Sequence, residues 1–264
     1  MLEGKSIESI SSKIKSHELK SEDVVKFFLD KIKRYNKDLN AIVSLRDETE
    51  IISEAKEKDR SIDNGNEIGL LHGMPLAIKD ITDVKELPTS FGCKEYKNNF
   101  PDEDSIISER LKKEGAIIIG KTNTTELAYG SQTSNRLFGS THNPYDITKT
   151  AGGSSGGAAA AVSSGMLPLA DGTDMMGSVR NPAAYCNLYG FRPTPGLIPE
   201  KRAEVSNIKY PLLSTLGGIA RTPNELSIFL DAVSGRDERD PFSFDLGNTF
   251  IDTSMSEEDF SKIK

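Results

Sequence analysis

The feature that most constrains this chain is a run of glycine and serine, Gly152-Gly153-Ser154-Ser155-Gly156-Gly157, placed directly before a stretch of small apolar residues. Glycine adopts positive φ angles without strain, and a loop so rich in glycine can also hold a cis peptide bond where its surroundings enforce one. Residues 158–162 then predict a helix of small side chains that lies close against a sheet, with its amino end at the serine loop. The segment therefore predicts a strained loop that presents serine hydroxyls at a functional site.

Around this loop, short apolar runs alternate with longer helical patterns, which is typical of an α/β fold. The first two helices each start at a serine, Ser6 and Ser21, which predicts a serine N-cap for both. We expect one domain over residues 1–264, with 1–62 as an amino-terminal helical layer and 63–264 as the α/β catalytic portion. Strands are expected at residues 76–78, 116–119 and 167–170, and helices at residues 6–16, 21–35, 48–60, 105–114 and 223–234.

The serines and one lysine predict a nucleophile with a proton relay. Ser178 follows in Gly177-Ser178-Val179-Arg180, and Lys79 comes directly after the apolar residues 76–78. A serine hydroxyl is a poor nucleophile at neutral pH and needs a base to take its proton, directly or through another hydroxyl. Lysine can be that base only when it is neutral, and burial at a strand end can lower its pKa by roughly 3–5 units. A neutral Lys79 could draw a proton from Ser154, which in turn draws one from Ser178.

Other interpretations of these residues have weaker support. The glycine-serine run lacks the Gly-Lys-Ser/Thr ending of a phosphate-binding P-loop, because alanines follow Gly157. Ordered flanks, a helix on one side and the turn Asn143-Pro144-Tyr145 on the other, argue against a flexible linker. A lone lysine is most often a solvated surface residue, so Lys79 gains significance only together with the serines. The histidines lie in a charged helical stretch, before a turn and in a loop, and none is well placed as a base: His17, His72 and His142.

Taken together, these segments resemble the amidase signature family, serine hydrolases of carboxylic amides that use a Ser–cis-Ser–Lys triad. The resemblance implies that Ser178 is the nucleophile that forms the acyl-enzyme, that Ser154 is the cis-serine that relays the proton, and that Lys79 is the terminal base. It also implies a supporting role for Ser155. The segments that carry it are residues 73–80, 120–126, 139–146, 151–165 and 171–185.

The same resemblance places an oxyanion hole beside the nucleophile and implies the architecture. The backbone N–H groups expected to form the hole are those of Met175, Met176, Gly177 and Ser178. Each such donor typically contributes about 10²–10³ in rate. The implied fold is α/β, with a mixed central sheet between helices.

The resemblance implies hydrolysis of a carboxylic amide to an acid plus ammonia or an amine. The sequence Thr173-Asp174-Met175 and the segment 190–196 resemble amidases that act without partner subunits. The alternative enzyme is a glutamyl-tRNA amidotransferase, whose A-type subunits would normally show Asp-Thr-Gly-Gly-Ser. A non-catalytic amidase fragment is the third alternative, because ancestry and present activity are separate questions.

Two departures from the family pattern shape the expectations for activity. Met176 stands where the family has a glycine, and a methionine with positive φ would cost on the order of 1–2 kcal/mol. Family members also continue well past residue 264, so we expect a fold that is incomplete at its carboxyl end and poorly active in isolation. An uncovered sheet edge predicts association, as a homodimer or with a complementing carboxyl-terminal segment.

The composition excludes several other classes of protein. A net charge of −7 without a basic stripe argues against direct binding of nucleic acid. Cys93 and Cys186 are too few for a disulfide scaffold, and neither belongs to a metal-binding pattern. No apolar stretch reaches the roughly 18–20 residues of a membrane span, and the amino terminus lacks an apolar signal region. We therefore expect a cytoplasmic enzyme without metal or cofactor that acts on a small-molecule amide.

Overall fold

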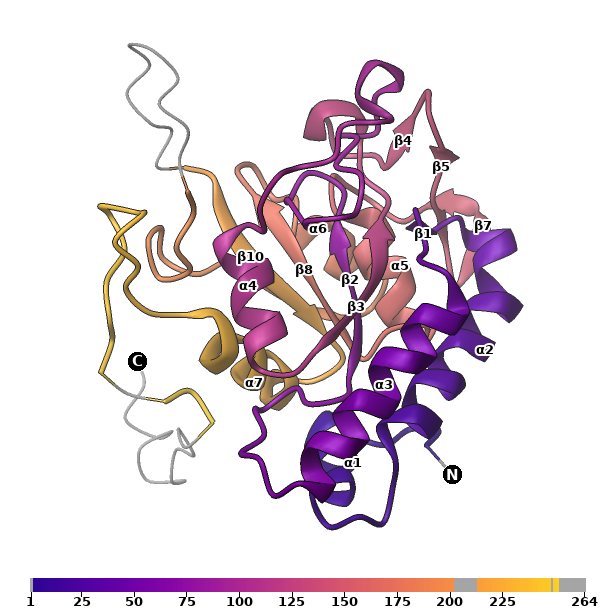
Figure 1. The fold of residues 1–264 in the computed structure, drawn as a ribbon. Helices are drawn as coiled ribbons and strands as arrows, with labels where there is room; N and C mark the ends of the chain where they lie inside the picture. Colours follow the sequence, from indigo (N-terminus) through magenta and orange to yellow (C-terminus); the bar gives the residue numbers. More distant parts are fainter. Residues whose placement is uncertain (1, 202–212, 248, 252–264) are drawn as a thin grey trace, which may run out of the picture.

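The computed structural model describes residues 2–201, 213–247 and 249–251, and these form a mixed α/β fold. In Figure 1 the strands β2, β3, β8 and β10 run through the middle of the molecule, and α1, α2 and α3 lie together on one side. The helices are α1 (Ile7–Lys15), α2 (Ser21–Leu39), α3 (Glu48–Asp63), α4 (Ile106–Lys113), α5 (Gly156–Ser163), α6 (Arg180–Tyr185) and α7 (Pro223–Val233). The strands are β1 (Ile42–Val43), β2 (Pro75–Lys79), β3 (Ile117–Thr122), β4 (Ser134–Asn135), β5 (Gly139–Ser140), β6 (His142–Asn143), β7 (Asp146–Thr150), β8 (Leu169–Asp174), β9 (Tyr189–Phe191) and β10 (Thr215–Ala220).

Two three-stranded sheets form the centre. One has the order β1-β3-β2, with β2 parallel and β1 antiparallel to β3. The other has the order β8-β10-β9 and is antiparallel throughout. A backbone-to-side-chain hydrogen bond from Lys79 N to Asp171 Oδ1, 2.9 Å long, joins β2 to β8. The carboxyl end of β2, at Lys79, therefore lies beside the middle of β8, and the predicted site residues 175–178 follow directly after β8.

Both faces of these strands are buried, which explains their continuous apolar runs. Leu76 and Ile78 face a core cluster that also holds residues of α1, α4 and α7. Ala77 faces a second cluster, built from α5 and parts of α2 and α3. The predicted arrangement of a mixed sheet between helices is confirmed.

The N-caps of the first two helices differ in whether the local sequence predicts them. Ser6 caps α1 as predicted, because its hydroxyl accepts from Ser9 N at 3.3 Å. Ser21 does not cap α2: the N-cap position is Lys20, which offers no side-chain cap, and Ser21 is the first helical residue. The Asp59 carboxylate on α3 accepts from the first free amides of α2 instead, at 2.6 Å from Ser21 N. A cap that comes from another helix leaves no trace in the local sequence.

Helix α5 is the element that carries the serine loop, and all its residues from Gly156 to Val162 are buried. Its side chains are small because the helix lies against β8, β10 and β2. A Cβ added to Gly157 would stand 2.3 Å from Asn123 N and 2.6 Å from Ala41 O, both backbone atoms. Glycine is therefore required here for close approach, and not for an unusual φ.

We expect Gly157→Ala to destabilise the protein by about 2–3 kcal/mol, as overpacking against backbone atoms that cannot move aside usually does. The measurement is the free energy of unfolding from urea denaturation. Ser163→Ala, on the same helix at a half-buried position, is the control and should change stability by less than about 0.5 kcal/mol. Equal stability of both variants would contradict the close-packing account.

Two expectations from composition can be compared with the structure. Cys93 and Cys186, which are too few for a disulfide scaffold, are both free and buried. Burial raises the pKa of the Cys186 thiol to about 12. Within the described residues, none of the helices is long and apolar enough to cross a membrane.

Candidate active site

The serine loop is held in an unusual backbone conformation before α5. The peptide bond between Gly153 and Ser154 is cis, and Gly152 has a φ of +78°. A Cβ at Gly153 would meet backbone atoms of residues 131 and 132 at 2.8–2.9 Å, so only glycine fits between the two segments. Ser155 N donates to Ser178 O at 3.1 Å, which joins this loop to the turn that carries the predicted nucleophile.

Lys79 ends β2 and is fully buried, as the sequence predicted. Its Nζ lies 2.7 Å from Ser154 Oγ and 2.8 Å from Thr173 Oγ1. Desolvation lowers the pKa of Lys79 to about 7, although the carboxylates of Asp171 and Asp174 act in the opposite direction. At neutral pH a large fraction of the amine is therefore uncharged and able to accept a proton from Ser154.

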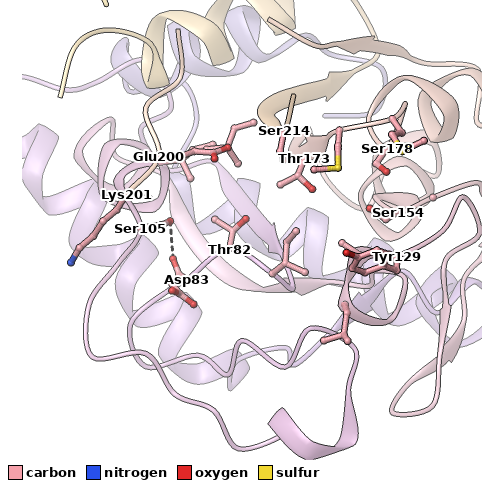
Figure 2. A pocket seen from close by; sticks show the side chains of 18 of the residues that line it. Thr82, Asp83, Ser105, Tyr129, Ser154, Thr173, Ser178, Glu200, Lys201 and Ser214 are labelled. Carbon is pink, nitrogen blue, oxygen red and sulfur yellow. Dashed lines mark hydrogen bonds between the residues drawn. The ribbon is translucent and has the colours of Figure 1, made fainter. Parts of the chain in front are cut away.

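Ser178 lies in the turn after β8 and lines a cavity of about 800 Å³ together with Ser154 and Thr173. Figure 2 shows the side chains of Ser178 and Ser154 at the same end of this cavity. Ser178 is half-buried, and its hydroxyl has no hydrogen-bond partner among the described residues. The contact between Lys79 and Ser154 that the relay needs is present, whereas no hydrogen bond joins the hydroxyls of Ser154 and Ser178 within the described residues.

Asp174 anchors the turn that presents Ser178. The carboxylate is completely buried and accepts from Gly177 N at 2.8 Å and Val179 N at 3.2 Å. Arg180 adds two side-chain hydrogen bonds of 2.9 Å, and Arg192 approaches to 3.5 Å. Burial alone would raise the pKa of Asp174, but the Arg180 guanidinium and the backbone donors outweigh it and lower the value to about 2. The carboxylate therefore stays ionised and holds the turn at any physiological pH.

The four amides predicted to form an oxyanion hole differ in their surroundings. Gly177 N donates to Asp174, so in this structure its N–H is occupied. The N–H groups of Met175, Met176 and Ser178 have no hydrogen-bond partner within the described parts of the chain. Met175 and Met176 also line the cavity. The predicted oxyanion hole therefore differs at Gly177, whose N–H already has a partner.

The expectation of backbone strain at Met176 is wrong. Met176 does not have a positive φ; the left-handed conformation falls on Gly177, with φ +108°. The Met176 side chain is 85% exposed, so it is not forced into the protein interior. The residue that requires glycine is Gly177, where a Cβ would also meet the Asn181 side chain at 2.7 Å.

Ser155, predicted to support the network, is fully buried. Its hydroxyl has no partner among the described residues, and its visible contribution is the backbone N–H bond to Ser178 O. Sequence reasoning missed Thr173 and Asp171, the two β8 residues that contact Lys79. Residues 171 and 173 alternate along the strand that leads to Ser178, so the sequence could have indicated that both side chains lie on one face near the site. No group of three or more potential metal-ligating side chains occurs in residues 2–201, 213–247 and 249–251.

Comparison with known proteins identifies the family of this chain. The sequence model of the Amidase family matches residues 23–263. An acylamidase of Rhodococcus erythropolis is 36% identical over 94% of this chain and 51% of its own length. An A-type subunit of glutamyl-tRNA(Gln) amidotransferase from Clostridium acetobutylicum is 40% identical over 89% of this chain and 48% of its own length.

Solved structures give the same family. A bacterial aryl acylamidase of the amidase signature enzymes superimposes with a TM-score of 0.87 at 32% identity, over 94% of this chain and 51% of that structure. Native peptide amidase from Stenotrophomonas maltophilia superimposes with a TM-score of 0.82 at 28% identity, over 94% and 52%. The chain thus spans about half the length of the relatives that it matches. It belongs to the amidase signature family.

Proposed function

We propose that this chain carries the catalytic residues for hydrolysis of a small-molecule carboxylic amide through an acyl-enzyme on Ser178. The observation that supports the proposal most directly is the buried contact of 2.7 Å between Lys79 Nζ and Ser154 Oγ. Among the described residues, the Lys79 amine has hydrogen bonds to two hydroxyls and none to a carboxylate, so it is placed to exchange protons with hydroxyl groups. The family membership of the chain points to the same reaction class.

In the proposed reaction, Ser178 Oγ attacks the amide carbonyl carbon while its proton passes to Ser154, whose own proton passes to Lys79. The carbonyl oxygen becomes an oxyanion that accepts hydrogen bonds from the free N–H groups of Met175, Met176 and Ser178. The C–N bond then breaks, and the relay returns the proton to the leaving amine. A water molecule, deprotonated through the same relay, releases the acid and restores Ser178.

The cavity supports a small organic substrate. Its volume of about 800 Å³ falls in the range of small-molecule sites. Apolar side chains of Ile81, Leu127 and Leu216 line it beside polar groups, and Ser154 and Ser178 lie at one end. Charged side chains line it as well, so the cavity offers a substrate both apolar and charged contacts: Asp83, Glu103, Asp104, Glu200 and Lys201.

The resemblance to A-type subunits of amidotransferases favours a second candidate function. In that case the chain would release ammonia from an amide donor for transfer, and it would act with partner proteins. The observation in its favour is the 40% identity to the Clostridium acetobutylicum protein. One observation argues against it. The segment Asp174-Met175-Met176-Gly177-Ser178 differs from the sequence Asp-Thr-Gly-Gly-Ser that is typical of those proteins.

The proposed function is tested by offering the chain an anilide, a primary amide and glutamine, with hydroxylamine as a competing acceptor. We expect amine or ammonia release from the anilide or the primary amide, together with a hydroxamate that reports the acyl-enzyme. Release from glutamine alone would favour the amidotransferase. Absence of hydroxamate from every substrate, with no labelling of Ser178 by a fluorophosphonate, would overturn both functions and leave a non-catalytic fragment.

A further inference from the structure

A second lysine is buried near Lys79. Lys121 on β3 is fully buried, and its Nζ donates to Thr82 O and, at 3.2 Å, to Thr89 Oγ1. Thr82 belongs to the wall of the cavity. Lys121 is paired with Ile78 in the register of β3 and β2, one position before Lys79. Burial of an ammonium group is costly unless it is hydrogen-bonded and balanced by a nearby negative charge.

A buried carboxylate, that of Asp171 on β8, lies against β2 at Lys79. This carboxylate is 1% exposed. Its Oδ1 accepts from Lys79 N at 2.9 Å, whereas Oδ2 is buried without a hydrogen-bond partner among the described residues. Desolvation raises the pKa of Asp171 to about 6, while the Lys79 N–H and the charges of Lys121 and Lys79 act to lower it. A carboxylate with one unsatisfied oxygen depends on these cations to remain ionised.

We propose that Asp171, kept ionised by Lys121, sets the pH at which Lys79 becomes a base. Asp171 is thus a positioning residue that acts through Lys79 and does not touch the substrate. The inference rests on the proposed function in one respect only, namely that the charge of Lys79 controls acylation of Ser178. The charge of Lys79 itself can be measured without any reaction.

The sign of the effect follows from the charges around Lys79. Asp171 and Asp174 on β8 both favour the ammonium form of Lys79, and Asp174 is already matched by Arg180 and Arg192. The neighbouring helix α5 consists of uncharged residues, and the buried residues of α2 carry no charge. The remaining nearby carboxylates act on Lys121. Burial lowers the pKa of Lys121 to about 8, and four carboxylates oppose this effect, those of Asp80, Asp171, Asp83 and Asp104. Loss of the Asp171 charge therefore leaves Lys79 neutral to a lower pH.

The first experiment compares the wild-type chain with Asp171→Asn, which keeps an oxygen that can accept from Lys79 N. Lysine labelled with ¹³C at Cε is titrated by NMR, and the Lys79 signal is assigned by its loss in Lys79→Arg. In parallel, the rate of fluorophosphonate labelling of Ser178 is measured against pH. We expect both midpoints to move to lower pH in Asp171→Asn, by on the order of 1 pH unit. An unchanged Lys79 midpoint in folded Asp171→Asn would overturn the inference.

The second experiment separates an electrostatic role of Lys121 from a merely structural one. Lys121→Met removes the cation, so Asp171 becomes protonated more easily and the Lys79 midpoint moves down by a smaller amount. Lys121→Arg keeps the cation and should retain the wild-type midpoint. In the Asp171→Asn background Lys121→Met should cause no further shift, because the group through which it acts is already neutral. If Lys121→Met raises the Lys79 midpoint both with Asp171 and with Asp171→Asn, the two lysines repel each other directly. That result would overturn the inference that Lys121 acts on Lys79 through Asp171.

Thr122→Val is the matched control. Thr122 neighbours Lys121 on β3, is fully buried, and its hydroxyl has no partner in the described part of the structure. The substitution therefore changes packing little and charge not at all, and both midpoints should stay at their wild-type values. The two readouts also separate the two proposals. If the Lys79 midpoint moves but Ser178 is never labelled, the inference is supported and the proposed function is contradicted. If Ser178 is labelled but the Lys79 midpoint does not move, the proposed function is supported and the inference is contradicted.

Discussion

Replacing Ser178 with alanine is expected to abolish labelling of the chain by a fluorophosphonate and to reduce any amide hydrolysis by at least about 10³-fold. The reason is that Ser178 lines the cavity beside Ser154, is half-buried, and has a hydroxyl without a hydrogen-bond partner in the described part of the chain. Ser154 cannot replace it, because its hydroxyl is buried against Lys79. Mass analysis of peptides from the labelled wild-type chain should place the phosphonyl group on Ser178.

Ser214→Ala is the control for this experiment, since Ser214 lines the same cavity away from the serine loop (Figure 2). It should leave the labelling rate close to the wild-type value. Thermal unfolding of both variants shows whether either substitution disturbs the fold. A label found on Ser154 or Ser155 would reverse the assignment of nucleophile and relay.

Replacing Lys79 should be nearly as damaging. Lys79→Ala removes the base, and Lys79→Arg supplies a group that cannot be deprotonated in a protein. General bases typically contribute about 10²–10⁴ in rate, so we expect labelling of Ser178 to fall by that factor in both variants at pH 7.5. Near wild-type labelling of Lys79→Arg would disprove the relay.

The pH dependence of the wild-type chain follows from the same residue. Burial lowers the pKa of Lys79 to about 7, so the amine is charged below this pH and neutral above it. Labelling of Ser178 should therefore rise as the pH increases through about 7 and level off above it. Lys85→Arg, at an exposed position, is the control and should retain the wild-type profile. A labelling rate that does not change between pH 5.5 and 8.5 would contradict the assignment of Lys79 as the base.

Several parts of the fold could be predicted from local sequence because the local and the tertiary requirements agree. Helix α5 is an example: its small residues predict close packing, and the structure buries the helix from Gly156 to Val162. Strand β10 was missed because Gly217 and Gly218 weaken the strand pattern. Side chains there would meet Phe191 O at 2.3 Å and the Phe229 ring at 2.7 Å, so the glycines are required by neighbours on β9 and α7 that only the folded chain brings into contact.

Helix α6 was missed for a related reason. Pro182 lies inside the short stretch Arg180–Tyr185, and proline in a helical pattern normally indicates a break. Here it occupies the first turn, where its missing N–H costs nothing, and Asp174 accepts from the free amides of Val179 and Arg180. The cap comes from the end of β8, before the turn, and only the folded chain brings it to the helix.

The sequence by itself determined which residues are available for chemistry: the serines of the glycine loop, Ser178 in its turn, and a lysine at the end of an apolar strand. Only the tertiary structure decided their chemical state. Lys79 contacts Ser154 and Thr173 across sequence separations of 75 and 94 residues. Its pKa is lowered by desolvation, which depends on every group packed around the amine, while the charges of Asp171 and Asp174 act in the opposite direction. No local pattern records that environment, because β2, β8 and α5 create it together when they pack.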